Sequence, residues 1–104
     1  MSQELQKAVQ ALTSSYKIHA IILFGSRARG NHLKTSDIDL IVVSNKFKQT
    51  PFVERPTQVL KALYKEGIVA PIDLLCYTPQ EFEKKKQEIG IVREALKTAK
   101  TLAK

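Results

Sequence analysis

The sequence predicts a small α/β domain in which helices pack on a mixed β-sheet. Three apolar segments have the length and composition of strands: Ile18–Phe24, Asp37–Ser44 and a segment from about Val69 to Tyr77. Helical patterns precede, separate and follow these segments, and this alternation is typical of a sheet covered by helices. We therefore expect the order αβαβαβα in a single domain that spans residues 1–104.

The first half of the chain supplies two of the strands. Ser2–Ser14 is expected to be a helix because its apolar residues recur at helical spacing. The next segment, Ile18–Phe24, is almost continuously apolar, which indicates a strand that is buried on both faces. Ser26–Arg29 has room only for a short helix, and Gly30 is placed to end it. The second strand, Asp37–Ser44, follows a polar loop.

The second half of the chain repeats the alternation. Asn45–Phe52 is polar and basic and is expected to be a loop, and a helix is expected from about Arg55 to Glu66. Pro71 lies near the beginning of the third strand, which predicts that this end is at a sheet edge or a bulge. Thr78 is followed by Pro and, three positions on, Glu, which is a strong signal for the start of a helix. Helical spacing then continues to the C-terminus, divided into two helices at Gly90.

Composition and charge exclude several classes of protein. An apolar share of 43% and a charged share of 26% are ordinary for a globular domain. Cys76 is the single cysteine, so an internal disulfide is excluded and a reducing, cytoplasmic location is expected. No apolar segment approaches the roughly 20 residues of a membrane helix. The net charge of +7 suits an anionic ligand such as a nucleotide, a nucleic acid or an acidic protein face, and a lysine-rich solvated surface explains it equally well.

Three aspartates are the candidate metal ligands. Asp37 and Asp39 are two positions apart at the start of a strand, so their side chains are expected on the same face, roughly 7 Å apart. Two such carboxylates repel each other unless a cation lies between them, and Mg²⁺ or Mn²⁺ prefers oxygen ligands. Asp73 interrupts the apolar third strand, where an acid is costly unless it is paired or metal-bound. Alone it would more often be a charge that protects an edge strand, but beside the other two it predicts a third ligand.

The residues before these aspartates are suited to phosphate. Gly25 lets a ligand approach the backbone closely, and Ser26 offers a hydroxyl and an N–H group at a predicted helix N-terminus. The guanidinium groups of Arg27 and Arg29 can bind phosphate oxygens, and the sequence does not decide between them. A triphosphate beside a metal site predicts a phosphoryl- or nucleotidyl-transfer centre.

Together these motifs resemble a known family. Gly25-Ser26, then ten residues, then Asp37-x-Asp39 is similar to the signature of the DNA polymerase β-like nucleotidyltransferases. The forms Gly-Ser-Arg-Ala-Arg-Gly and Ser-Asp-Ile-Asp-Leu resemble the minimal nucleotidyltransferases of bacteria and archaea. Asp73 matches the family's third carboxylate, so the resemblance spans most of the chain. It implies a nucleotidyltransferase fold in which the three acids gather at one end of the sheet.

The resemblance also implies a reaction. A nucleoside monophosphate, with ATP as the expected donor, would be transferred from an NTP to a hydroxyl group with release of pyrophosphate. Ser26 and the adjoining backbone would hold the β- and γ-phosphates. Asp37 and Asp39 would hold the nucleotide-bound Mg²⁺ and share a second ion with Asp73, which would lower the pKa of the attacking hydroxyl or accept its proton. One of the two arginines would offset charge in the transition state.

Family resemblance further implies a partner protein. Minimal nucleotidyltransferases are commonly paired with a small helical HEPN protein, often as antitoxin to a HEPN ribonuclease, and some add AMP to a tyrosine of that partner. This chain is therefore expected to be a protein adenylyltransferase of a HEPN/MNT toxin–antitoxin pair. One alternative is an antitoxin or nucleotide-binding regulatory subunit that binds without turnover. Another is a basic nucleic-acid-binding module, which is less favoured because no RNA- or DNA-binding motif is present.

Overall fold

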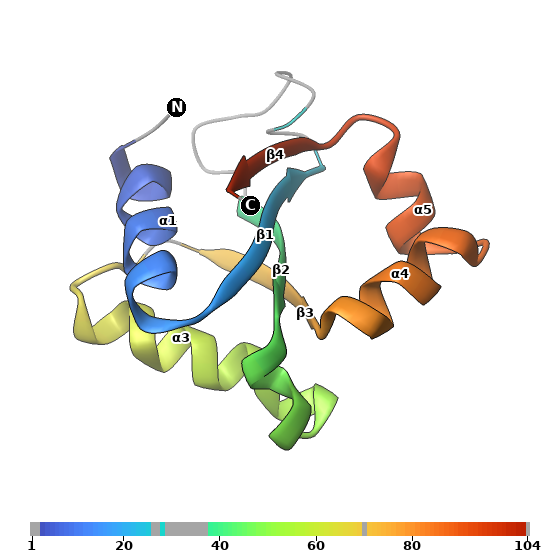
Figure 1. Cartoon of the computed structure of the whole chain (residues 1–104). Coiled ribbons are helices and arrows are strands. Elements are labelled where there is room, and N and C mark those ends of the chain that lie inside the picture. Colours follow the sequence, from blue (N-terminus) through green and yellow to red (C-terminus); the bar gives the residue numbers. More distant parts are fainter. Residues whose placement is uncertain (1–2, 26–27, 29–37, 70, 104) are drawn as a thin grey trace.

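One mixed β-sheet forms the centre of the molecule (Figure 1). The structure is a computed structural model, and it describes residues 3–25, 28, 38–69 and 71–103. The sheet has the strand order β3-β2-β1-β4, and its strands are β1 (Ile18–Phe24), β2 (Ile38–Ser44), β3 (Ile72–Tyr77) and β4 (Lys100–Ala103). Strand β1 is antiparallel to both β2 and β4, whereas β2 and β3 are parallel. The predicted α/β class with a mixed sheet is confirmed.

Helices cover both faces of this sheet, as Figure 1 shows. Helices α1 (Gln3–Ser15) and α3 (Arg55–Lys65) pack on one face, and α4 (Pro79–Gln87) and α5 (Ile91–Leu96) pack on the other. The alternation of side chains along β2 produces the two layers, because Leu40 and Val42 belong to the first core and Ile41 to the second. The central strands are therefore apolar on both faces, as the unbroken composition of β1 predicts.

The C-terminal segment differs from its prediction. Gly90 does divide two helices, but the helical spacing does not continue to the end: α5 stops at Leu96, and residues Lys100–Ala103 form β4 beside β1. Leu96 and Ala99 still pack on the core beneath α4 and α5, which explains why their spacing resembled a helix. Pairing with the free edge of β1 outweighs local propensity here, since an unpaired apolar edge would leave a row of backbone groups without partners.

The segment after β2 was also predicted incorrectly as a loop. It contains two 3₁₀ helices, η1 (Asn45–Gln49) and η2 (Phe52–Glu54), and the Ser44 hydroxyl caps the first of them by accepting a hydrogen bond from the Lys46 N–H. Phe47 anchors this segment, because its side chain is fully buried and its ring lies 5.7 Å from that of Tyr16. A single buried aromatic residue thus orders a sequence that is otherwise polar and basic.

The remaining boundaries agree closely with expectation. The first helix, first strand, third helix and capped α4 are confirmed within one or two residues, and β3 is an edge strand as Pro71 indicated, although it begins at Ile72 rather than near Val69. Of the short helix predicted at Ser26–Arg29, only Ala28 is described, and it is helical and buried; the start of β2 at Asp37 lies outside the described residues. Among the described helices, none is long and apolar enough to cross a membrane.

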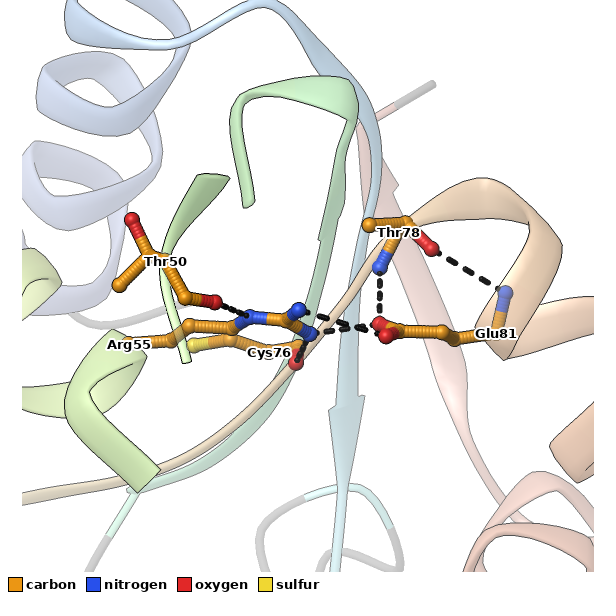
Figure 2. Close-up of polar contacts among 5 residues, drawn as sticks. All are labelled: Thr50, Arg55, Cys76, Thr78 and Glu81. Carbon is orange, nitrogen blue, oxygen red and sulfur yellow. Dashed lines mark hydrogen bonds and ion pairs between the residues drawn. The ribbon is translucent and has the colours of Figure 1, made fainter. Parts of the chain in front are cut away.

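Arg55 joins three elements at the end of β3 (Figure 2). Its guanidinium donates to the Thr50 carbonyl at 2.9 Å, to the Cys76 carbonyl at 3.1 Å and to both carboxylate oxygens of Glu81. Glu81 in turn accepts the Thr78 N–H, and its own N–H donates to the Thr78 hydroxyl, so the predicted helix start is a complete capping box. This network holds α4 in place over the second core.

Candidate active site

Two of the three predicted metal ligands are neighbours in the sheet. Asp39 of β2 is the register partner of Asp73 of β3, and on its other side it is the register partner of Phe24 of β1. Residues in register across adjacent strands have side chains on the same face, with strands about 4.8 Å apart. Phe24, Asp39 and Asp73 therefore form one row across the sheet, and we call this the carboxylate row.

The carboxylate row lies at an open end of the sheet. The rows behind it on the same face contain Ile41 and Val43, which are fully covered, whereas Asp39 is half-buried and Asp73 is exposed. Strand β1 ends at this row, and β2 and β3 begin at it. The gathering of acids at one end of the sheet, which the family resemblance implied, is observed for these two residues.

The environment of Asp73 corrects one step of the sequence argument. The sequence suggested an acid buried among apolar residues, but Ile72 and Leu74 point to the α1–α3 face while Asp73 is exposed on an edge strand. An exposed acid at an edge carries little desolvation cost and needs no metal to explain it. The case for Asp73 as a functional residue now rests on its position beside Asp39.

Gly25 brings backbone directly against the carboxylate row. It follows β1 with a φ of +74°, in the left-handed region that favours glycine. A β carbon built on this residue would collide with the Asp39 carboxylate oxygen Oδ2 and lie 3.2 Å from its Cγ. The sequence predicted a glycine here for close approach of a ligand, and the structure adds a second reason, which is the close approach of Asp39 itself.

The donor set fits a hard divalent cation. Two carboxylates on adjacent strands repel each other, and a cation between them removes that repulsion while using the oxygen ligands that Mg²⁺ and Mn²⁺ prefer. In the described part of the chain, no group of three or more His, Cys, Asp or Glu residues could hold a metal ion. The other predicted site residues, Asp37, Ser26, Arg27 and Arg29, lie outside that part.

Phe24 is the member of the row that sequence reasoning did not assign to the site. Its ring is half-buried beside Asp39 and packs against the core under α4 and α5. Its position in the sequence was a usable signal. Phe24 directly precedes the Gly-Ser turn, and a residue in that position lies next to any ligand that the turn binds. Phe24 thus forms an apolar wall next to the carboxylates.

Comparison with known proteins is consistent with this geometry. The sequence profile of the nucleotidyltransferase domain matches residues 4–102, nearly the whole chain. The chain belongs to the nucleotidyltransferase domain family. The resemblance drawn from Gly25-Ser26 and the aspartates is thereby confirmed.

Two candidate protein adenylyltransferases of Methanocaldococcus jannaschii are similar to this nucleotidyltransferase domain. One is 36% identical over 83 residues, which are 78% of this chain and 77% of that protein. The other is 45% identical over 47 residues, which are 45% of this chain, and the match spans about half, 51%, of that protein's length.

Solved structures agree on the fold. A candidate nucleotidyltransferase of Sulfolobus solfataricus has a TM-score of 0.61 and 28% identity, over 79% of this chain and 70% of that one. A toxin–antitoxin structure with AMP-PNP also has a TM-score of 0.61, over 98% of this chain and 73% of that one. At 21% identity, the second likeness concerns the fold alone.

Proposed function

We propose that this chain transfers AMP from ATP to a hydroxyl group of a partner protein, in a reaction that requires Mg²⁺ or Mn²⁺. The observation that carries the proposal is the register of Asp39 with Asp73, with the backbone of Gly25 packed against Asp39, in a chain of the nucleotidyltransferase domain family. The naming of two relatives as candidate protein adenylyltransferases supports AMP as the transferred group and a protein as acceptor.

The proposed residues act on the nucleotide and on the acceptor. The backbone of Gly25 and Ser26 holds the β- and γ-phosphates, with Arg27 or Arg29 offsetting their charge. Asp39 and Asp37 would hold the nucleotide-bound ion, and Asp73, facing the acceptor, would complete the site for a second ion. When bound, these ions lower the pKa of the attacking hydroxyl and neutralise charge on the leaving pyrophosphate.

The transfer itself is a single displacement at phosphorus. The acceptor oxygen forms a bond to the α-phosphorus while the bond from that phosphorus to its bridging oxygen breaks, and pyrophosphate leaves with the electron pair. The hydroxyl proton passes to the Asp73 carboxylate, which is exposed and able to meet an acceptor from solution. Asp73 is therefore proposed as the general base and Asp39 as a nucleotide-side ligand.

A small helical HEPN protein is the proposed acceptor, with this chain as the antitoxin of the pair in the cytoplasm. This assignment rests on the resemblance to the minimal nucleotidyltransferases, and the fold shared with a toxin–antitoxin structure with AMP-PNP is in keeping with it. Holding the acceptor hydroxyl next to the α-phosphorus can lower the free-energy barrier to transfer by roughly 7–11 kcal/mol. A docked partner supplies that orientation, so we expect slow transfer to hydroxyl compounds free in solution.

Intact-mass spectrometry of the proposed HEPN partner tests the proposal. After incubation with ATP and Mg²⁺, the partner is expected to gain the mass of one or more AMP groups. Asp73→Asn should lower the rate by a hundredfold or more, because general-base catalysis typically contributes that much. Glu54→Gln, which neutralises an exposed carboxylate of η2, is the matched control and should transfer normally. An unmodified partner that is nevertheless bound and inhibited would replace transfer with the binding-only alternative.

A further inference from the structure

A groove lies at the end of the sheet opposite the carboxylate row. It consists of two adjoining cavities of about 550 and 400 Å³ between the end of α1, η1 and α3, both bordered by Tyr16 and Gln58. Lys46 and Lys48 line the first cavity, and Lys61 and Lys65 line the second. We call this surface the basic groove. The elements that line it, the end of α1, α3 and the green segment after β2, can be followed in Figure 1.

Positive charge in the basic groove is hardly compensated. No acidic residue lines the first cavity, and Glu66 is the single acidic residue in the lining of the second. Within the described residues, the ion pairs are made by Arg55, Lys85, Lys86 and Lys97, and none involves a lysine of the groove. Like charges held together without counter-charges attract anions from solution.

One of these lysines is held in place by the fold. The Lys46 ammonium donates to the Ser15 carbonyl at 3.0 Å and lies 5.6 Å from the centre of the Tyr16 ring. The Tyr16 ring in turn packs against the buried Phe47. A cation of the first cavity is therefore held beside an aromatic ring that borders both cavities.

We propose that the basic groove binds the backbone of a single-stranded nucleic acid. Lysines at both ends of the groove match a ligand with regularly spaced charges, and the ring and amide groups between them suit bases. The lining contains a single aliphatic residue, Ala62, whereas the centre of a protein–protein interface is normally apolar. The groove thus fits a phosphate backbone better than an acidic protein surface.

This assignment is independent of the proposed transfer reaction. Tyr16 precedes β1 and Gly25 follows it, so the seven residues of β1 separate the groove from the carboxylate row by roughly 20 Å. Binding at the groove needs neither ATP nor a metal ion. It can therefore be measured without either, and its failure would leave the proposed adenylyl transfer untouched.

Fluorescence anisotropy with a labelled, unstructured oligouridine RNA tests the inference, without ATP or divalent metal. Lys46→Gln combined with Lys61→Gln should weaken binding about tenfold or more at low salt, and the slope of log affinity against log salt should fall by about 1.4. The matched control is Lys84→Gln with Lys97→Gln, which removes the same charge from α4 and the segment after α5. This control should bind almost as well as the unmodified chain.

Three results would overturn the inference. Equal weakening by the groove variant and the control would mean that RNA responds only to the net charge of +7. Competition by an oligoglutamate peptide as effective as that by unlabelled RNA would assign the groove to acidic protein segments. If the unmodified chain shows no detectable RNA binding at low salt, the groove is not a nucleic-acid site. The four substituted lysines, two in the groove variant and two in the control, are all exposed. Thermal unfolding is therefore expected to confirm that both variants fold.

Discussion

Gly25 and Asp39 pack so closely that residue 25 has no room for a β carbon. The ideal β-carbon position is 3.2 Å from Asp39 Cγ and collides with the carboxylate oxygen Oδ2. The φ of Gly25, +74°, independently disfavours any other residue. The turn after β1 and the Asp39 carboxylate therefore constrain each other, and a change in one displaces the other.

Gly25→Ala should damage the site as well as the backbone. The left-handed conformation alone costs on the order of 1–3 kcal/mol of stability, and the added methyl group must also push the Asp39 carboxylate aside. We expect binding of Mg²⁺–ATP to weaken at least tenfold, as measured by isothermal titration calorimetry. Gly67→Ala is the control, since Gly67 has a φ of +78° but nothing within 4 Å of its added carbon. It should lose similar stability and bind normally, and similar binding losses in both variants would refute the role of the Asp39 contact.

The part of the candidate site that depends on the alternation of side chains along one strand could be predicted from the sequence. Alternation along a strand places Asp39 on the face opposite Leu40, and the structure agrees. No local pattern fixes the parallel register of β2 with β3, which sets Asp73 beside Asp39 at an exposed edge. The sequence argument identified Asp73 through the family resemblance and through an expected cost of burying its carboxylate. In the structure Asp73 is exposed, so that cost does not arise.

Elements defined by distant contacts were missed for the same reason. Strand β4 exists because β1 offers it an edge, although its sequence continues a helical spacing. Phe47 orders η1 because it reaches the core beside Tyr16, within a segment that is polar overall. The basic groove combines lysines from η1 and α3, which are far enough apart in sequence that no charge run reveals them.

Arg55 is expected to be the most sensitive charged residue of the scaffold. Its side chain is 6% exposed, and Arg55→Met would leave the Thr50 and Cys76 carbonyls without its hydrogen bonds. Leaving these two carbonyls without partners should cost about 3 kcal/mol in urea unfolding. Glu81→Gln should cost less, because Glu81 is 43% exposed and a glutamine can still accept the Thr78 N–H. Equal costs for the two variants would contradict a network centred on Arg55.

The same pair predicts an acid-dependent stability. The hydrogen bond from Arg55 lowers the pKa of Glu81 below its usual 4.5, so the folded state favours the carboxylate. This contribution is present above pH 4.5 and is lost as the pH falls through the lower pKa of the folded state. Arg55→Met should therefore lose less stability than the unmodified chain over that acidic range. Because Glu81 is partly exposed, the difference should be small and should shrink with added salt.

Cys76 predicts a loss of stability in alkali. Burial raises the pKa of this thiol from 9.0 to about 12, although the positive charge of Arg55 acts in the opposite direction. The unfolded chain therefore releases the proton first, and stability that is complete below pH 9 is lost between about pH 9 and 12. The loss attributable to this thiol can reach about 4 kcal/mol, since one pKa unit corresponds to about 1.4 kcal/mol.

Urea unfolding at a series of pH values from 7 to 11 measures this effect, with Cys76→Ala as the comparison. The variant is expected to be less stable at pH 7, because it leaves a small cavity at a fully buried position. Its stability should then fall more gently with pH, so that the two curves converge. Burial raises the pKa values of Tyr16 and Tyr77 in both proteins, and the charge of the Cys76 thiolate raises them further in the unmodified chain, so their titration adds to the difference in the same direction. Parallel curves would show that the Cys76 thiol ionises as readily in the folded chain as in the unfolded one.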